Sequence, residues 1–129
     1  MSRRTFKVIV AGSRTAGQDV DAYLLLESKL NILLKRKSIT HDIVIVSGTA
    51  NGADKMGEHY ATVYNYKVER YPADWNRFGK RAGYIRNETM AQNADALVAL
   101  WDGESRGTKH MIDIAGQHFL PTRIISLNQ

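Results

Sequence analysis

Residues 6–14 have the sequence FKVIVAGSR, a short apolar run that ends at Gly12. The run at residues 6–11 is rich in β-branched side chains and predicts a buried strand. Glycine then allows a sharp turn, and residues 19–36 carry leucine and isoleucine at helical spacing in a polar background. The order of strand, glycine turn and helix is the repeating unit of parallel α/β sheets.

This order of strand and helix continues along the chain. We expect further strands at residues 43–46, 67–71, 96–100 and 122–126, helices at 53–64, 82–94 and 108–118, and loops at 72–79 and 101–107. Such alternation requires right-handed crossovers, so the strands lie parallel and helices cover both faces. The sequence therefore predicts one Rossmann-like, doubly wound α/β domain over residues 1–129, with about five strands.

Composition narrows the class of protein. The 129 residues include 43% hydrophobic ones, which suits one globular domain. No apolar run approaches the ~18 residues of a membrane helix and no signal peptide is recognised, so we expect a cytoplasmic protein with no membrane partner. The absence of cysteine excludes disulfides and thiolate catalysis, and the four histidines lack metal-ligand spacing. We expect no cofactor or metal, unless Mg²⁺ arrives with a nucleotide.

Three loops follow predicted strands and precede predicted helices. The loops are residues 12–14, 47–54 and 102–108, and each contains glycine beside a hydroxyl side chain, while the first and third also contain an arginine. The helix N-termini after them carry free N–H groups that favour anions. For any one loop taken alone, turn formation and helix capping are the favoured explanation of these residues. Three loops at one sheet edge favour a phosphate site instead. The candidate residues are Gly12, Ser13, Arg14, Ser47, Gly48, Gly52, Asp54, Ser105, Arg106, Gly107 and Thr108.

Residues 70–86 combine aromatic and basic side chains. Five basic residues stand there against one acid, and the whole chain has a formal net charge of +5, which suits an anionic partner. Aromatic rings beside cations can stack a base and neutralise phosphate, although Trp75 and Phe78 could equally pack the loop onto the sheet. Trp75, Arg86 and Asn87 are the binding candidates of this segment.

Three carboxylates lie on or near the predicted edge. Asp54, Glu88 and Asp102 could act as acid, base or oxocarbenium stabiliser in cleavage of an N-glycosidic bond. Helix capping by Asp54 and Asp102, and a solvated position for Glu88, are equally consistent with the pattern. Neither a Walker A motif nor a dinucleotide-type Gly-x-Gly-x-x-Gly occurs in the chain, which argues against ordinary NTPase or nicotinamide chemistry.

Five motifs in order resemble the YspA-type branch of the SLOG superfamily. They are AGSR at residues 11–14, VSGTANGAD at 46–54, PADW at 72–75, AGYIRNETM at 82–90 and WDGESRGT at 101–108. The superfamily is named for the DprA/Smf proteins, which bind single-stranded DNA, and the LOG enzymes, which are phosphoribohydrolases. The resemblance implies a Rossmann-like nucleotide site and a homodimer or higher homo-oligomer.

The chain departs from the LOG pattern at one position. Arg86 and Met90 match the LOG arginine context and Gly107-Thr108 its phosphate-binding pair, but Met111 stands where LOG enzymes carry the catalytic glutamate. Methionine cannot perform that chemistry, so hydrolysis would need another carboxylate, with Glu88 first, then Asp54 and Asp102. We therefore expect a nucleotide-ligand sensor or sequestering protein first, an N-glycoside hydrolase second and a single-stranded nucleic acid binder third.

Overall fold

The structure is a computed structural model that describes residues 3–14 and 20–127. Its strands are β1 (Arg4–Gly12), β2 (His41–Ser47), β3 (Lys67–Arg70), β4 (Ala96–Trp101) and β5 (Thr122–Ser126). Its helices are α1 (Val20–Thr40), α2 (Ala53–Val63), α3 (Trp75–Phe78), α4 (Ala82–Gln92) and α5 (Arg106–Gln117), with a 3-10 turn η2 (Gly79–Arg81). The predicted alternation of strands and helices is confirmed.

All neighbouring strands pair in parallel, in the order β3-β2-β1-β4-β5. From the central strand β1 the chain builds outward through β2 and β3, then returns to add β4 and β5 on the other side. The strand order therefore reverses between β1 and β4, whose ends pair Gly12 with Leu100. Ligands of open α/β sheets bind beyond the carboxyl ends of the strands at such a point.

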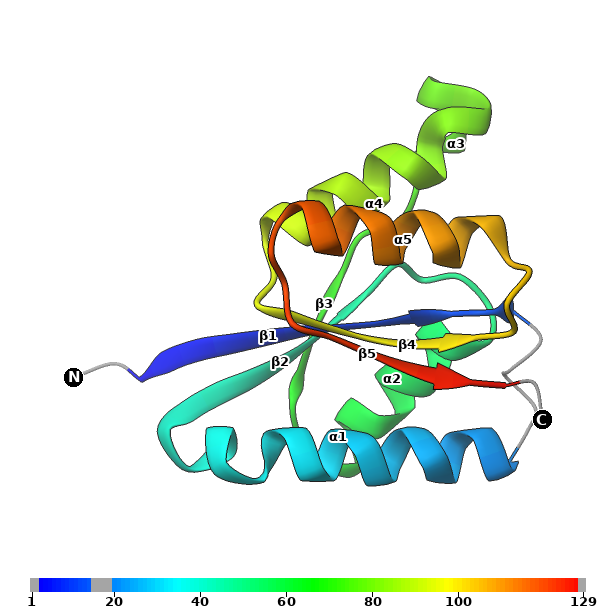
Figure 1. Cartoon of the computed structure of the whole chain (residues 1–129). Helices are drawn as coiled ribbons and strands as arrows, with labels where there is room; N and C mark the ends of the chain where they lie inside the picture. Colours follow the sequence, from blue (N-terminus) through cyan, green and yellow to red (C-terminus); the bar gives the residue numbers. More distant parts are fainter. Residues whose placement is uncertain (1–2, 15–19, 128–129) are drawn as a thin grey trace.

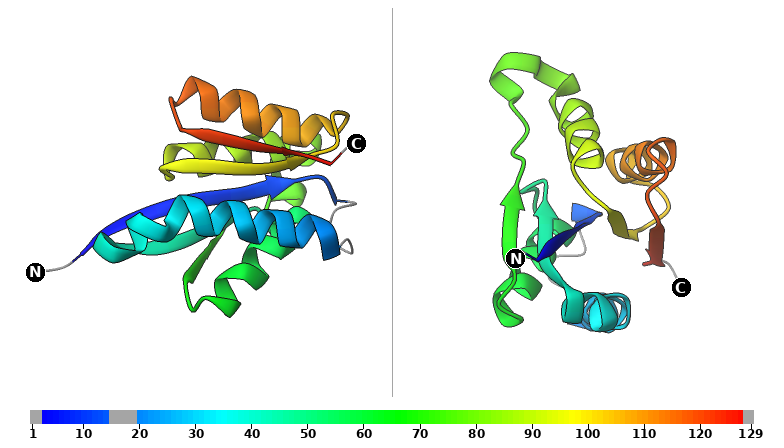
Figure 2. Two further views of the ribbon diagram at one scale, coloured as in Figure 1. Left: turned by 60° about the horizontal axis from the view of Figure 1, so that its bottom comes forward. Right: turned by 90° about the vertical axis from the view of Figure 1, so that its left-hand side faces the viewer.

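Helices cover both faces of the sheet (Figure 1). On one face, α1 contributes Ala22, Leu26, Leu30 and Leu34, whose spacing of four residues makes one buried stripe, and α2 packs beside it. On the other face, α4 and α5 cover the sheet through Met90, Ala91, Met111 and Ala115. Figure 2 shows these layers from two further directions. The predicted Rossmann-like doubly wound fold is confirmed.

The segment at residues 72–79, predicted as a loop, contains α3 and leads into η2. Asp74 caps α3 by accepting a hydrogen bond from the Arg77 backbone N–H at 3.1 Å, a local helix signal that the aromatic and basic composition obscured. The loop predicted at residues 101–107 is shorter in the structure, because β4 continues through Trp101 and α5 already begins at Arg106. Within residues 3–14 and 20–127, no helix combines the length and apolarity needed to cross a membrane.

Candidate functional site

A cleft of about 270 Å³ lies at the carboxyl ends of β1 and β4, where the strand order reverses. Its walls come from β1, the loop before α2, the arm formed by α3 and η2, and the helices α4 and α5. Its lining is mostly small, polar or basic, which suits a compact anionic ligand. The lining residues are Ala11, Gly12, Arg14, Ala50, Asp54, Trp75, Lys80, Gly83, Tyr84, Arg86, Asn87, Met90, Ser105, Gly107, Thr108 and Met111.

The end of β1 forms the floor of the cleft. Gly12 has a φ of 155°, and a Cβ there would stand 2.1 Å from the Leu100 carbonyl oxygen, so only glycine fits between the two strands. Ser13 continues this junction, since its N–H donates to that same oxygen at 2.9 Å and its hydroxyl accepts from the Asp102 N–H at 3.2 Å. Ser13 thus connects the loop after β1 to the loop after β4. The Arg14 side chain is exposed and lines the cleft.

The N-terminus of α5 forms a second wall. Ser105 is the N-cap, and its Oγ accepts from the Thr108 N–H at 3.4 Å and lies 3.0 Å from the Thr108 hydroxyl. Asp102 holds the preceding loop by accepting the N–H groups of Glu104 and Ser105, each at 2.8 Å. These bonds direct the first turn of α5, with Gly107, at the cleft. Helix N-termini carry a partial positive charge that stabilises anions.

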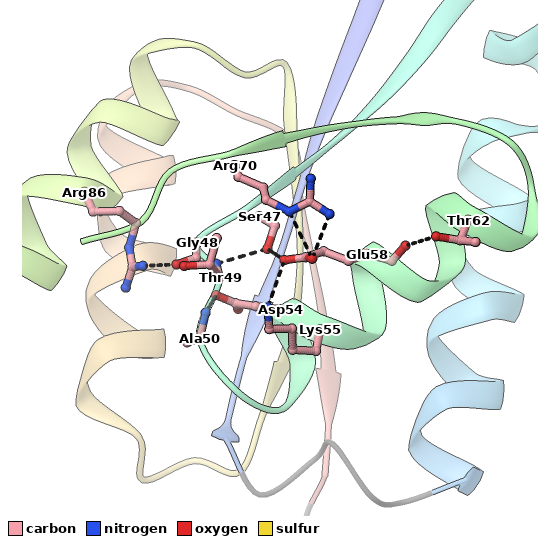
Figure 3. Close-up of polar contacts among 10 residues, drawn as sticks. All are labelled: Ser47, Gly48, Thr49, Ala50, Asp54, Lys55, Glu58, Thr62, Arg70 and Arg86. Atoms are coloured by element: carbon pink, nitrogen blue, oxygen red, sulfur yellow. Dashed lines mark hydrogen bonds and ion pairs between the residues drawn. The ribbon is translucent and has the colours of Figure 1, made fainter. Parts of the chain in front are cut away.

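The loop before α2 is held by internal contacts, as Figure 3 shows. The Ser47 hydroxyl donates to Glu58 at 2.7 Å and accepts from the Thr49 N–H at 3.0 Å, while Arg70 bonds the other Glu58 oxygen. Partial burial would raise the pKa of Glu58, but the hydrogen bonds from Ser47 and Arg70 bring it below its usual value. The polar side chains at the start of this loop are thus already paired within the fold.

Arg86 of α4 brings a half-buried cation to the cleft. Its guanidinium donates to the Gly48 carbonyl oxygen (Figure 3). Through Nε it also donates to the Asn87 side chain at 3.0 Å. Burial lowers the pKa of Arg86, and the nearby charge of Arg14 acts in the same direction, while Asp54 opposes it. No carboxylate of the described residues lies within ion-pair distance of Arg86. A half-buried guanidinium whose hydrogen-bond partners are neutral is well suited to pairing with an incoming anion.

Asp54 is a buried carboxylate in the first turn of α2. It accepts a hydrogen bond from the Ala50 N–H at 3.1 Å and lines the cleft. Burial raises the pKa of Asp54 to about 6, although the hydrogen bond from Ala50 and the charge of Arg86 both oppose the shift. Gly48 leaves the space between Asp54 and Arg86, since a Cβ there would stand within 2.9 Å of both side chains. Asp54 therefore titrates close to neutral pH.

The sequence profile of the YspA, cpYpsA-related SLOG family matches residues 6–78 of the chain. The gene 61 protein of Mycobacterium phage D29 is 30% identical over 121 residues, which cover 89% of this chain and 92% of the phage protein. The chain belongs to the YspA, cpYpsA-related SLOG family. The resemblance read from the five motifs is thereby confirmed.

Two solved structures share the fold of this SLOG chain. The X-ray structure of TM1055 matches with a TM-score of 0.63 and 17% identity, over 92% of this chain and 72% of TM1055. DNA processing protein A from Helicobacter pylori, whose structure describes its single-stranded DNA binding mode, matches with a TM-score of 0.58 and 16% identity, over 92% of this chain and 64% of that protein. At these identities the likeness concerns the fold alone.

The structure brings nine of the predicted binding residues of this SLOG chain into one cleft. They come from all three loops and from the aromatic segment. The nine are Gly12, Arg14, Asp54, Trp75, Arg86, Asn87, Ser105, Gly107 and Thr108. Asn87 is placed by α5, because its side chain donates to the Gly107 carbonyl at 3.3 Å and lies 3.1 Å from the His110 ring nitrogen.

Five other predicted binding residues lie outside the cleft lining. Ser13 and Ser47 are buried and hold loops together, as described above. Gly48 and Gly52 serve close approaches, of Arg86 to Gly48 and of residues 13–14 to Gly52. The Arg106 side chain is exposed at the start of α5. For the two serines and the two glycines, the turn-forming and loop-packing alternative matches the structure, while binding by Arg106 stays a prediction.

The three carboxylates considered as catalytic candidates differ in where they lie relative to the cleft. Glu88 does not line the cleft; it pairs with His118 at 3.1 Å, beside a groove between α4 and α5. It follows Arg86 by two residues on α4 and so points from a different side of the helix. Asp102 also lies outside the lining and is engaged by its own loop. Asp54 is left as the carboxylate of the cleft among the described residues.

Several lining residues were not predicted as site residues. Lys80, Gly83 and Tyr84 lie in the aromatic and basic segment that drew attention to Trp75, so its composition carried the signal. Tyr84 packs on His110 with ring centroids 4.3 Å apart. Ala11, Ala50, Met90 and Met111 are small or apolar, so their side-chain chemistry gave no reason to name them as binding residues. Among residues 3–14 and 20–127, no group of three His, Asp or Glu side chains is arranged to hold a metal ion.

Proposed function

We propose that the cleft binds the phosphate group of a nucleotide or nucleotide-derived ligand, and that the protein acts as a sensor or sequestering protein. The observation that carries the proposal is the half-buried guanidinium of Arg86, which makes no ion pair within the described residues and lies in the same cleft as the N-terminus of α5. Arg14 and Lys80 add positive charge at the margin of this cleft. Membership of the SLOG family supports nucleotide or nucleic acid binding in general.

The first test is native mass spectrometry of the purified protein with a panel of ligands. The panel contains nucleosides, nucleoside mono-, di- and cyclic phosphates, nucleotide sugars and a dT oligonucleotide, and products are read by chromatography. We expect a phosphate-bearing ligand to bind and return unchanged, about 10- to 100-fold tighter than its nucleoside. Preference for the oligonucleotide would instead favour a single-stranded nucleic acid binder. The same spectra report homo-oligomers and bound Mg²⁺, which stay predictions.

Two helical glycines of α5 make a matched pair for the phosphate position. A Cβ added at Gly107 or at Gly116 meets no atom within 4 Å, so neither alanine variant should destabilise the fold. Gly107→Ala places a methyl group at the cleft and should weaken phosphate binding about 10-fold, whereas Gly116→Ala, at the far end of the helix, should not. Equal affinities of the two variants, measured by calorimetry, would show that phosphate does not bind at α5.

Asp54 supports N-glycoside hydrolysis as a second candidate function. Burial keeps its pKa near 6, where a carboxyl group can donate or accept a proton at neutral pH. Met111, at the position of the LOG glutamate, lines the cleft but cannot replace that group. Release of free base that disappears in Asp54→Asn but persists in Glu88→Gln would establish this activity.

A further inference from the structure

The arm between β3 and α4 carries exposed aromatic surface that the fold does not use. Its helical turns α3 and η2 contain no buried residue, and α3 stands beyond α4 on the side away from the sheet (Figure 1). Trp75, the first residue of α3, is 52% exposed and lines the cleft. A half-exposed tryptophan beside a cleft is more typical of ligand contact than of core packing.

The indole of Trp75 is part of the cleft wall that the arm forms. A Cβ on Gly83 would lie 3.4 Å from the tip of this indole and 3.7 Å from a guanidinium nitrogen of Arg86. The ring and the cation therefore both lie close to Gly83, which has no side chain. Tyr84, which is 45% exposed, follows on α4 with its ring against His110. Lys80 of η2 completes this end of the lining.

We propose that Trp75 and Tyr84 form a stacking subsite for the base of a nucleoside monophosphate whose phosphate binds between Arg86 and α5. This inference rests on the proposed phosphate site and names the ligand class. The cleft of about 270 Å³ is small for a ligand pocket, so it takes the phosphate and sugar and leaves the base on the arm. Stacking on aromatic rings tolerates any base, which gives broad base selectivity with purines preferred for their larger faces.

The test compares adenosine 5′-monophosphate with ribose 5-phosphate, which carries the same phosphate and sugar without a base. By calorimetry, the wild-type protein should bind the nucleotide about 5- to 100-fold tighter than the sugar phosphate, the range expected for one stacked base. Trp75→Ala should lower this ratio several-fold by weakening only the nucleotide, and the further change Tyr84→Ala should bring it to about one, while Trp75→Phe should retain most of it. The nucleotide should quench tryptophan fluorescence in the wild type and much less in Trp75→Phe.

Phe78→Ala provides the control on the same arm. Phe78 ends α3 and lines a different groove together with Tyr71 and Ile85, so its loss tests whether the arm matters only as a packed unit. The ratio of the two affinities should stay unchanged in this variant. Equal loss of the ratio in Phe78→Ala and Trp75→Ala would overturn direct stacking.

The outcomes separate this inference from the proposed function. If neither compound binds, both the phosphate site and the stacking subsite are wrong. If both bind with equal affinity and Trp75→Ala changes nothing, the phosphate site stands and the stacking subsite is wrong. A Trp75→Ala protein that loses an oligomer, by sedimentation, with its affinity ratio intact would assign the exposed indole to a second copy of the chain and also overturn the subsite.

Discussion

Two helix N-termini at the same sheet edge look alike in sequence and differ in structure. The loops at residues 47–54 and 102–108 both combine serine, threonine, glycine and aspartate directly before a helix. In the first, the Ala53 N–H donates to the Ser13 carbonyl at 3.3 Å, and Ser47 bonds Glu58. In the second, the cap and the glycine of α5 line the cleft.

The loop at residues 47–54 is held mainly by contacts within the fold and is called the closed loop below. The loop at residues 102–108 presents its helix N-terminus to the cleft. Residues of the first loop find partners on α2, on α4 and at Ser13, so most of its polar groups are used internally, although Ala50 and Asp54 also line the cleft. Residues of the second bond mainly to each other, which holds the N-terminus of α5 in place without covering it. Glycine and hydroxyl content alone does not distinguish them; the deciding feature is what stands opposite each loop.

The largest expected effect is on the closed loop. Gly52 has a φ of 86°, and a Cβ there would stand 2.4 Å from the carbonyl oxygens of Ser13 and Arg14. Gly52→Ala adds backbone strain and a clash with fixed backbone, so we expect a loss of about 4 kcal/mol in the free energy of unfolding. Denaturant unfolding followed by circular dichroism measures this change.

Gly79→Ala is the matched control for backbone strain. Gly79 also has a positive φ, 59°, but a Cβ there meets no atom within 4 Å. Its alanine variant should lose only about 2 kcal/mol, the cost of a backbone conformation, φ 59° and ψ −136°, that residues with a side chain rarely adopt. A loss in Gly52→Ala no greater than in Gly79→Ala would mean that the first loop is not closed against residues 13–14.

The second effect concerns Asp54, whose pKa burial raises from 3.8 to about 6. Between about pH 4 and pH 6 the folded protein binds more protons at this group than the unfolded chain, so stability falls as the pH rises through this window. Asp54→Asn removes the buried charge and should stabilise the protein by about 2 kcal/mol at pH 7, with no gain below about pH 4. Thermal unfolding at several pH values follows this difference.

Glu58→Gln should show the opposite dependence on pH. Hydrogen bonds from Ser47 and Arg70 outweigh burial and lower the pKa of Glu58, so its charge stabilises the fold above the unfolded value of 4.5. This contribution is lost as the pH falls through the lowered pKa of the folded state. The glutamine variant should therefore be less stable than the wild type at pH 7 and equal to it in acid. Parallel pH profiles of the two variants would contradict the assigned pKa directions.

The fold could be predicted from sequence because hydrophobic periodicity determines it directly. The continuous run at residues 6–11 reflects a strand that is buried on both faces of the sheet. The four-residue spacing from Ala22 to Leu34 reflects the one buried stripe of α1. The turns of α3 could not be predicted in this way, because they bury no residue and depend on the single cap of Asp74. Short exposed helices lack the periodic signal on which such predictions depend.

The site could be predicted in part, for a different reason. Loop position after a parallel strand identified the correct edge, which brought nine of the predicted residues together. Sequence could not tell whether a side chain on α4 faces the cleft or the outer groove, so Glu88 was placed first among the candidate carboxylates although it lines the outer groove. Nor could the sequence show that the Ser47 hydroxyl donates a hydrogen bond to Glu58, because that contact depends on the packing of α2 against β2.

The smallest expected effect sharpens the comparison with two serines. Ser47 donates to Glu58 inside the closed loop, and Ser105 caps α5 at the cleft. Replacing either with alanine removes two hydrogen bonds of its hydroxyl, so each variant should lose about 1 kcal/mol of stability or more. Only Ser105→Ala should also weaken binding of a phosphate-bearing ligand, because only that serine lines the cleft. Calorimetric affinities that fall equally in both variants would show that the two N-termini act as one site, and that closure of the first loop is as necessary for binding as the second loop itself.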